Sequence, residues 1–316
     1  MSRFRLGLVG MMIGLVAGLT SAALNPPDLA GPFSFETIEI SLRDESRNRS
    51  MDLEVFYPVS ESDCGPRPLI LFNHGFLLSA SAYRSYGEHL ASHGFVVALP
   101  SLPMSILGVH HGKLAEDVRF VIDTLLAFSA EETHALSLKI DPESIGASGH
   151  SLGGKLSLLE AVSDDRIDAI AVLDPVDGGN PLWSDPDRYP SVAPQLMPEI
   201  HIPLLFVGAE LGKILIAFSP CAPEGENYER FFEAANSPAI EITQLDVGHG
   251  QYVDEGVEVS PCARGNVSSE SVRASSRAYL TAFFLGRLTS DQDALDWLDA
   301  RLAADAEAGQ IAVRRK

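Results

Sequence analysis

Residues 145–155 read IGASGHSLGGK and contain the pattern Gly-x-Ser-x-Gly at positions 149–153. This pattern is typical of a nucleophile elbow, a sharp turn that lifts a serine out of a buried strand at the start of a helix. The turn is crowded, so the residues two before and two after the serine must be small, as Gly149 and Gly153 are. We therefore predict that Ser151 is a nucleophile and that the N–H of Leu152 points toward the reacting carbonyl oxygen.

Strands and helices alternate on both sides of this motif. Apolar runs of strand length lie at residues 69–73, 95–99, 145–147, 167–173, 203–207 and 240–245, and helical patterns lie at 83–93, 113–128, 152–162 and 272–288. This alternation is typical of a mostly parallel central sheet with helices on both faces. Residues 35–42 and 51–59 precede it as an antiparallel N-terminal hairpin. With the elbow and a late histidine, the pattern predicts an α/β-hydrolase fold.

The composition bounds the class of protein. The chain has 316 residues, 46% of them hydrophobic and 21% charged, which is ordinary for a globular protein. Its formal net charge of −20 argues against nucleic-acid phosphates and anionic membrane surfaces as partners. We expect one α/β-hydrolase catalytic domain at residues 24–289, followed at 290–316 by a peripheral helix and a tail. The sequence indicates no oligomeric state.

Residues 1–23 have the pattern of a secretory signal peptide. Arg3 and Arg5 precede an apolar run at 6–19, and small residues follow at 20–23. The run is shorter than the roughly 20 residues of a membrane-spanning helix. We expect a secreted or periplasmic protein with no stable membrane span after cleavage, and an N-terminal membrane anchor is the alternative.

Export would make disulfide bonds possible for the three cysteines. Cys221 and Cys262 lie in similar Pro-Cys-Ala settings on either side of His249. We expect these two to pair and Cys64 to remain unpaired, although sequence spacing alone does not fix a pairing.

A serine nucleophile needs a base, and the base needs an orienting acid. In this fold the three residues follow in the order serine, acid, histidine. His249 follows the last predicted parallel strand and is the expected base. Two acids sit at strand ends after the elbow, Asp174 and Glu210, and the residues alone leave the choice open, with Glu210 at the commoner position of the fold.

The other expected parts of the site are loops. The loop after the first core strand, at residues 73–76, supplies the second oxyanion donor, the N–H of Phe76. The proline-rich stretch at 178–198 is a candidate substrate loop, because ligands of open α/β sheets bind beyond the strands' carboxyl ends, and an ordinary surface loop is the equal alternative. His110 and His111 are interpreted as a surface pair, and a position beside the cleft is the alternative. No metal-ligand cluster or cofactor fingerprint is present, so we expect neither a metal nor a cofactor.

Several segments resemble chlorophyllase, at residues 71–78, 91–97, 149–155, 173–178 and 220–228, and the histidine of Val-Gly-His at 247–249 has the same position. The resemblance spans about residues 35–288. It implies an esterase that cleaves the phytyl ester of chlorophyll to chlorophyllide and phytol. In that family the Asp of Asp-Pro-Val is the triad acid, which favours Asp174 over Glu210.

Two alternatives stand beside this interpretation. Leu152 occupies a position where plant members usually carry arginine, so the first alternative is a broad-specificity secreted esterase, lipase or polyester hydrolase. The second is a non-catalytic binding protein of the same fold, which would be free to lose any one of Ser151, Asp174 and His249. The expected partner in the leading interpretation is a small lipophilic ester.

Overall fold

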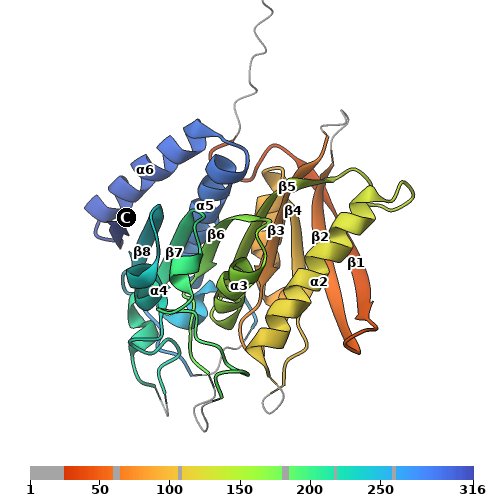
Figure 1. Ribbon diagram of the computed structural model, residues 1–316. Helices are drawn as coiled ribbons and strands as arrows, with labels where there is room; N and C mark the ends of the chain where they lie inside the picture. Colours follow the sequence, from red (N-terminus) through yellow and green to blue (C-terminus); the bar gives the residue numbers. More distant parts are fainter. Residues whose placement is uncertain (1–24, 60–64, 106–108, 180–184, 217–218, 258–260) are drawn as a thin grey trace, which may run out of the picture.

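The strands form one mixed sheet in the computed structural model, which describes residues 25–59, 65–105, 109–179, 185–216, 219–257 and 261–316. The order across the sheet is β1-β2-β4-β3-β5-β6-β7-β8-β9 (Figure 1). The strands are β1 (Ser34–Asp44), β2 (Arg49–Val59), β3 (Arg67–Asn73), β4 (Val96–Ser101), β5 (Ile140–His150), β6 (Ile167–Leu173), β7 (Leu204–Ala209), β8 (Ala239–Gln244) and β9 (Ile311–Arg315). Strands β3 to β8 are parallel, and β1 and β2 form the antiparallel hairpin. The predicted α/β-hydrolase architecture is confirmed.

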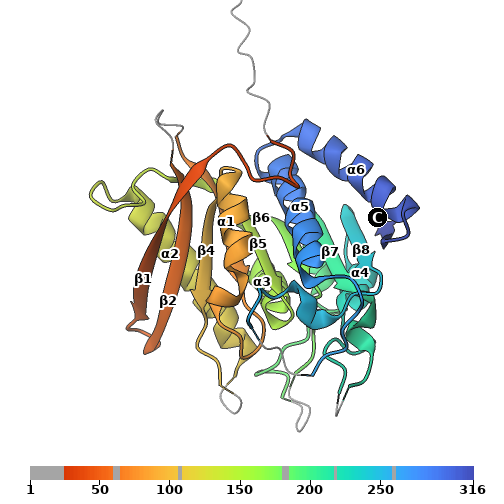
Figure 2. The ribbon, with the colours of Figure 1, turned by 180° about the vertical axis from the view of Figure 1, so that it is seen from behind.

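Helices cover both faces of the sheet. The face toward the viewer in Figure 1 carries α2 (His111–Ala130), α3 (Leu152–Ser163) and the short α4 (Tyr228–Ala234). The opposite face carries α1 (Arg84–Ser92), α5 (Ser269–Leu288) and α6 (Gln292–Glu307), as Figure 2 shows. Because helices cover both of its faces, a central strand such as β6 has nearly every side chain buried, which explains its continuous apolar sequence.

The C-terminal segment corrects the expectation of a peripheral helix and a tail at 290–316. The helix is present as α6, but the residues after it form β9, an antiparallel edge strand paired with β8. The Nε of Arg314 donates to Glu241 at 2.9 Å, and its guanidinium lies over the ring of Phe232. Only Ile311 of this strand is buried. Its short, basic sequence therefore lacks the run of alternating apolar residues that would predict a strand.

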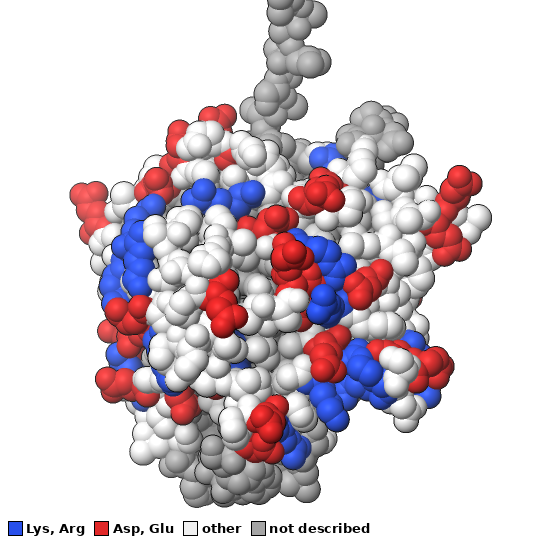
Figure 3. All heavy atoms as spheres, in the orientation of Figure 1, with Lys and Arg blue, Asp and Glu red and all other residues white. Residues whose placement is uncertain are grey.

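One face of the molecule is mixed in charge. Acidic and basic side chains are interspersed over the face shown in Figure 3. None of the helices in the described ranges is both long enough and apolar enough to cross a membrane. The predicted signal peptide at 1–23 and Cys64 lie outside the described residues.

Replacement of Ile311 tests whether β9 is part of the folded domain. Ile311→Ala removes a buried side chain that is 5% exposed, so we expect the free energy of unfolding to fall by about 2–3 kcal/mol. The matched change Arg315→Ala, at an exposed position of the same strand, should cost less than about 0.5 kcal/mol. Urea unfolding followed by circular dichroism measures both. Equal, negligible effects would show that the segment is a frayed end after all.

Candidate active site

The predicted elbow is formed by the turn between β5 and α3. Ser151 has a φ of 57° and a ψ of −122°, a strained backbone conformation for a residue with a side chain. A Cβ atom added to Gly153 would lie 2.0 Å from the carbonyl oxygen of Asn73, and one added to Gly149 would lie 2.6 Å from the backbone of Gly153. The two glycines therefore let the elbow pack directly against the end of β3.

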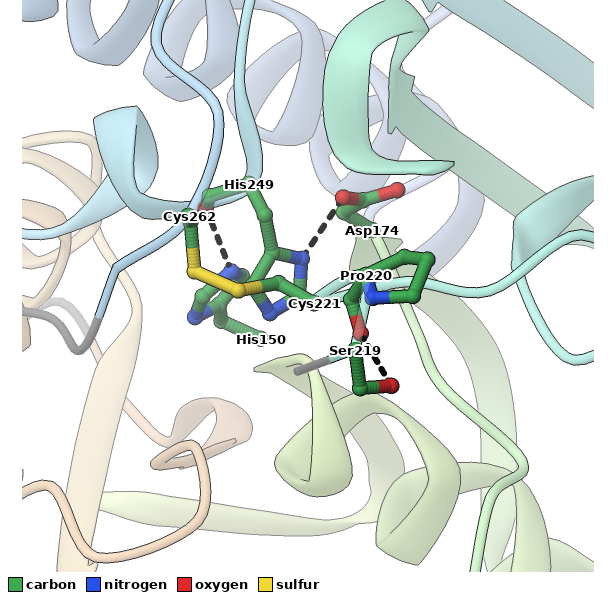
Figure 4. Close-up of a disulfide and its surroundings, with 7 residues drawn as sticks. All are labelled: His150, Asp174, Ser219, Pro220, Cys221, His249 and Cys262. Atoms are coloured by element: carbon green, nitrogen blue, oxygen red, sulfur yellow. Dashed lines mark hydrogen bonds and ion pairs between the residues drawn. A yellow bond between two sulfur atoms is a disulfide. The ribbon is translucent and has the colours of Figure 1, made fainter. Parts of the chain in front are cut away.

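The carboxyl ends of the parallel strands bring three distant residues to one edge of the sheet. Ser151 follows β5, Asp174 follows β6 with a φ of 39°, and His249 begins the 3-10 turn His249–Tyr252 beyond β8. The Nδ1 of His249 lies 2.7 Å from Oδ2 of Asp174, and both side chains are buried (Figure 4). The other carboxylate oxygen of Asp174 accepts the N–H of Ala209 at 3.2 Å. This carboxylate is therefore held toward the imidazole.

The other acids near this edge have different partners. Glu210 lies at the end of β7, but its Oε2 accepts the backbone N–H of Asp246 at 2.8 Å. Asp177 is buried beside the ammonium of Lys155, 3.3 Å away, and also accepts the backbone N–H groups of Val192 and Ala193. Glu210 thus fixes the loop after β8, and Asp177 fixes the candidate substrate loop.

His150 connects three loops of the site by hydrogen bonds. The N–H of Gly75 donates to the hydroxyl of Tyr83 at 3.3 Å, and that hydroxyl lies 2.7 Å from Nδ1 of His150. The Nε2 of His150 lies 3.0 Å from the carbonyl oxygen of His249. Complete burial, together with the neighbouring His249, holds the pKa of His150 well below its usual range. The ring is thus neutral and accepts from Tyr83 while donating to His249.

His74 also joins two segments through hydrogen bonds to the backbone. Its Nε2 accepts the backbone N–H of Leu102 at 2.9 Å, and Nδ1 donates to the carbonyl of Gly75 at the same distance. Burial lowers its pKa, so it stays neutral in this role. The loop that carries Phe76 is therefore tied to the end of β4.

The two predicted oxyanion donors line the same cavity as Ser151. Leu152 is the first residue of α3, and Phe76 lies in the turn after β3. Within the described residues, neither backbone N–H is used in a hydrogen bond. Two unpaired donors beside a serine can stabilise negative charge that develops on a carbonyl oxygen.

A cavity of about 670 Å³ contains these groups. Ser151 and His249 line it, together with apolar side chains and the backbone of Gly178 and Gly179 from the candidate substrate loop. This volume is in the range of pockets that enclose a small organic ligand. The described residues contain no group of side chains suited to hold a metal ion.

The predicted disulfide between Cys221 and Cys262 is present and lines the cavity next to His249 (Figure 4). It joins the loop after β7 to the loop beyond His249 across 41 residues of sequence. A cross-link that closes a loop of this length lowers the entropy of the unfolded chain and so stabilises the folded state by about 3–4 kcal/mol on the chain-entropy model.

One cavity residue follows the alternative that the sequence favoured less. His111, interpreted with His110 as a surface pair, is only 4% exposed and lines the cavity at the start of α2. The available signal was its place at the head of a strongly amphipathic helix that follows β4. The connection after this strand ends at the same edge of the sheet as Ser151.

Comparison with known proteins supports one family. The sequence model of the chlorophyllase family matches residues 29–303. Chlorophyllase-2 of Arabidopsis thaliana is 30% identical over 213 residues, which cover 64% of this chain and 65% of the relative. The chloroplastic chlorophyllase-1 of Citrus unshiu is 28% identical over 263 residues, which cover 79% of this chain and 77% of the relative. Lipase 1 of Moraxella sp. (strain TA144) is 29% identical over 157 residues, half of this chain and 46% of the lipase.

The family match covers most of the chain. The chain is a carboxylic-ester hydrolase of the α/β-hydrolase type and belongs to the chlorophyllase family.

Proposed function

We propose that this esterase acts through a Ser151–His249–Asp174 triad. The observation that carries the proposal is the 2.7 Å contact between His249 Nδ1 and Asp174 Oδ2, beside a cavity that Ser151 and His249 share. A buried carboxylate on Nδ1 fixes the tautomer that leaves the Nε2 lone pair free, and it stabilises the imidazolium that forms later.

The reaction then follows from the positions of these groups. The Oγ of Ser151 attacks the ester carbonyl carbon while His249 takes the hydroxyl proton. The negatively charged oxygen of the tetrahedral intermediate accepts hydrogen bonds from the backbone N–H groups of Phe76 and Leu152. When the intermediate collapses, His249 returns the proton to the leaving alcohol and an acyl-enzyme remains. Water, activated by the same histidine, then hydrolyses the acyl-enzyme.

The proposed substrate is chlorophyll, cleaved at its phytyl ester to chlorophyllide and phytol. The family match and the relatives named chlorophyllase support this choice. The cavity is large and partly apolar, as a lipophilic ester requires. A broad esterase or lipase is the second candidate, favoured by Leu152 and by the match to the Moraxella lipase.

We also propose that the protein is exported as a single-domain enzyme. The charged and apolar pattern of residues 1–23 supports a signal peptide. The disulfide supports an oxidising compartment, since such bonds are rare in reducing cytosol.

Exchange of each strand-end acid tests the triad. Asp174→Asn keeps the shape but favours the wrong histidine tautomer, so we expect kcat to fall by about 10⁴. Glu210→Gln should reduce kcat less than about tenfold, because the amide oxygen can still accept the Asp246 N–H. Steady-state hydrolysis of p-nitrophenyl butyrate measures both effects, with thermal melts to verify folding. A large loss for Glu210→Gln beside a small loss for Asp174→Asn would assign the acid to Glu210.

A substrate panel tests the proposed ester. The mature protein should convert chlorophyll a to chlorophyllide and phytol with a higher kcat/KM than short or long p-nitrophenyl esters or a soluble polyester oligomer. Ser151→Ala should release no product from any of them. Chromatography of the pigments and absorbance of p-nitrophenol give the rates. Turnover of the model esters without turnover of chlorophyll would favour the broad esterase.

A further inference from the structure

His111 is a buried histidine on the cavity wall, and its ring nitrogens have no hydrogen-bond partner among the described residues. It is the first residue of α2 and is 4% exposed. Neither ring nitrogen forms a hydrogen bond with any of the residues that the structure describes, and Nδ1 is buried without a partner. Its neighbour His110 differs, because its Nδ1 accepts the N–H of Lys113 at the start of the helix. A buried polar atom without a partner costs about 1–3 kcal/mol, and with Nδ1 enclosed in the protein, Nε2 is the ring nitrogen left available to a ligand in the cavity.

The ring of His111 is held in place by the candidate substrate loop. Its backbone N–H donates to the carbonyl of Arg188 at 2.9 Å. Its imidazole packs edge-on against the ring of Tyr189, with centroids 5.0 Å apart and planes at 77°. Asp177 in turn holds this loop through the N–H groups of Val192 and Ala193. The ring is therefore preorganised, with little side-chain freedom left to lose when a ligand binds.

The protonation of the ring follows from its surroundings. Burial, helped by the positive charges of Lys155, His110 and Arg188, lowers the pKa of His111 to about 3. The neutral ring has one N–H and one lone pair. Nδ1 is shielded from solvent, so Nε2 is the ring nitrogen open to the cavity. An orphaned buried N–H is rarer than an under-used acceptor, which favours the proton on Nε2.

We propose that the Nε2–H of His111 donates a hydrogen bond to a carbonyl oxygen on the acyl portion of the substrate, apart from the scissile carbonyl. The assignment rests on the proposed function. Phytol is a hydrocarbon alcohol and offers no acceptor beyond the ester itself, so the acceptor belongs to the pigment acid. His111 is thus a specificity-determining residue of the cavity.

The same imidazole is poorly arranged to bind the central magnesium of the pigment. A metal-bound histidine almost always donates its second ring N–H to an acceptor. Nδ1 of His111 has no such acceptor among the described residues. A hydrogen bond to oxygen therefore fits the site better than a bond to magnesium.

Two replacements of His111 distinguish the effect of its N–H donor from the effect of its aromatic ring. His111→Phe keeps an aromatic ring against Tyr189 and removes the N–H, whereas His111→Gln restores an N–H donor. His110→Ser is the matched control, since serine can still cap α2 and His110 does not line the cavity. The substrates are chlorophyll a, its magnesium-free derivative pheophytin a, and p-nitrophenyl acetate, whose acyl part has no second carbonyl.

Loss of one neutral hydrogen bond should raise KM for both pigments by about three- to tenfold in His111→Phe, with kcat changed less than about threefold. His111→Gln should recover most of that loss. The p-nitrophenyl acetate kinetics of both variants, and all kinetics of His110→Ser, should stay at the wild-type values.

The outcomes distinguish this assignment from the proposed function. A wild-type enzyme that hydrolyses p-nitrophenyl acetate but neither pigment refutes the proposed substrate and the His111 assignment with it. Normal pigment turnover with an unchanged KM in His111→Phe refutes only the assignment. A parallel loss on p-nitrophenyl acetate would indicate a structural role. A loss confined to chlorophyll, with pheophytin unaffected, would indicate a magnesium ligand instead of a hydrogen-bond donor.

Discussion

The contact between the start of α3 and the end of β3 is the constraint on which the site depends. No side chain fits at Gly153, because a Cβ there would lie 2.0 Å from the carbonyl oxygen of Asn73. This close approach places Ser151 and the N–H of Leu152 next to the loop that carries Phe76. A serine at positive φ is strained, and the packing of the elbow between neighbouring strands holds it there. The proposed nucleophile and the proposed oxyanion donors are thus brought together by one backbone contact.

A second set of contacts positions the base relative to this elbow. His150 belongs to the elbow. Its ring accepts a hydrogen bond from the hydroxyl of Tyr83 and donates one to the carbonyl oxygen of His249. The disulfide then joins the loop beyond His249 to the loop after β7. Because the ring of His150 is neutral, it can bridge these segments without placing a positive charge beside the imidazolium of the proposed reaction. The proposed triad is therefore supported by hydrogen bonds and a covalent link at once.

Local patterns were enough to predict the parts of the fold that one segment determines. The elbow glycines, the buried parallel strands and the position of His249 each follow from a short stretch of sequence. The family resemblance favoured Asp174, and the contact with His249 agrees with it. The residues alone did not decide between Asp174 and Glu210 as the triad acid, because both follow a strand. Only the structure shows that the carboxylate of Glu210 accepts the backbone N–H of Asp246.

The predictions that failed depend on partners distant in sequence. β9 is stabilised by pairing with β8 and by contacts of Arg314 with Glu241 and Phe232, none of which its own five residues reveal. His111 carries no motif, and its burial depends on Tyr189 from a loop far along the chain. In both cases tertiary contacts outweigh what the local sequence indicates.

The central claim is that Ser151 is a nucleophile activated by His249, and covalent labelling tests it most directly. Treatment with a fluorophosphonate should add one phosphonyl group to the mature protein. Peptide mapping should place it on Ser151, and His249→Ala should slow the labelling by several orders of magnitude. A folded wild-type protein that does not label, or that labels at another serine, would contradict the account.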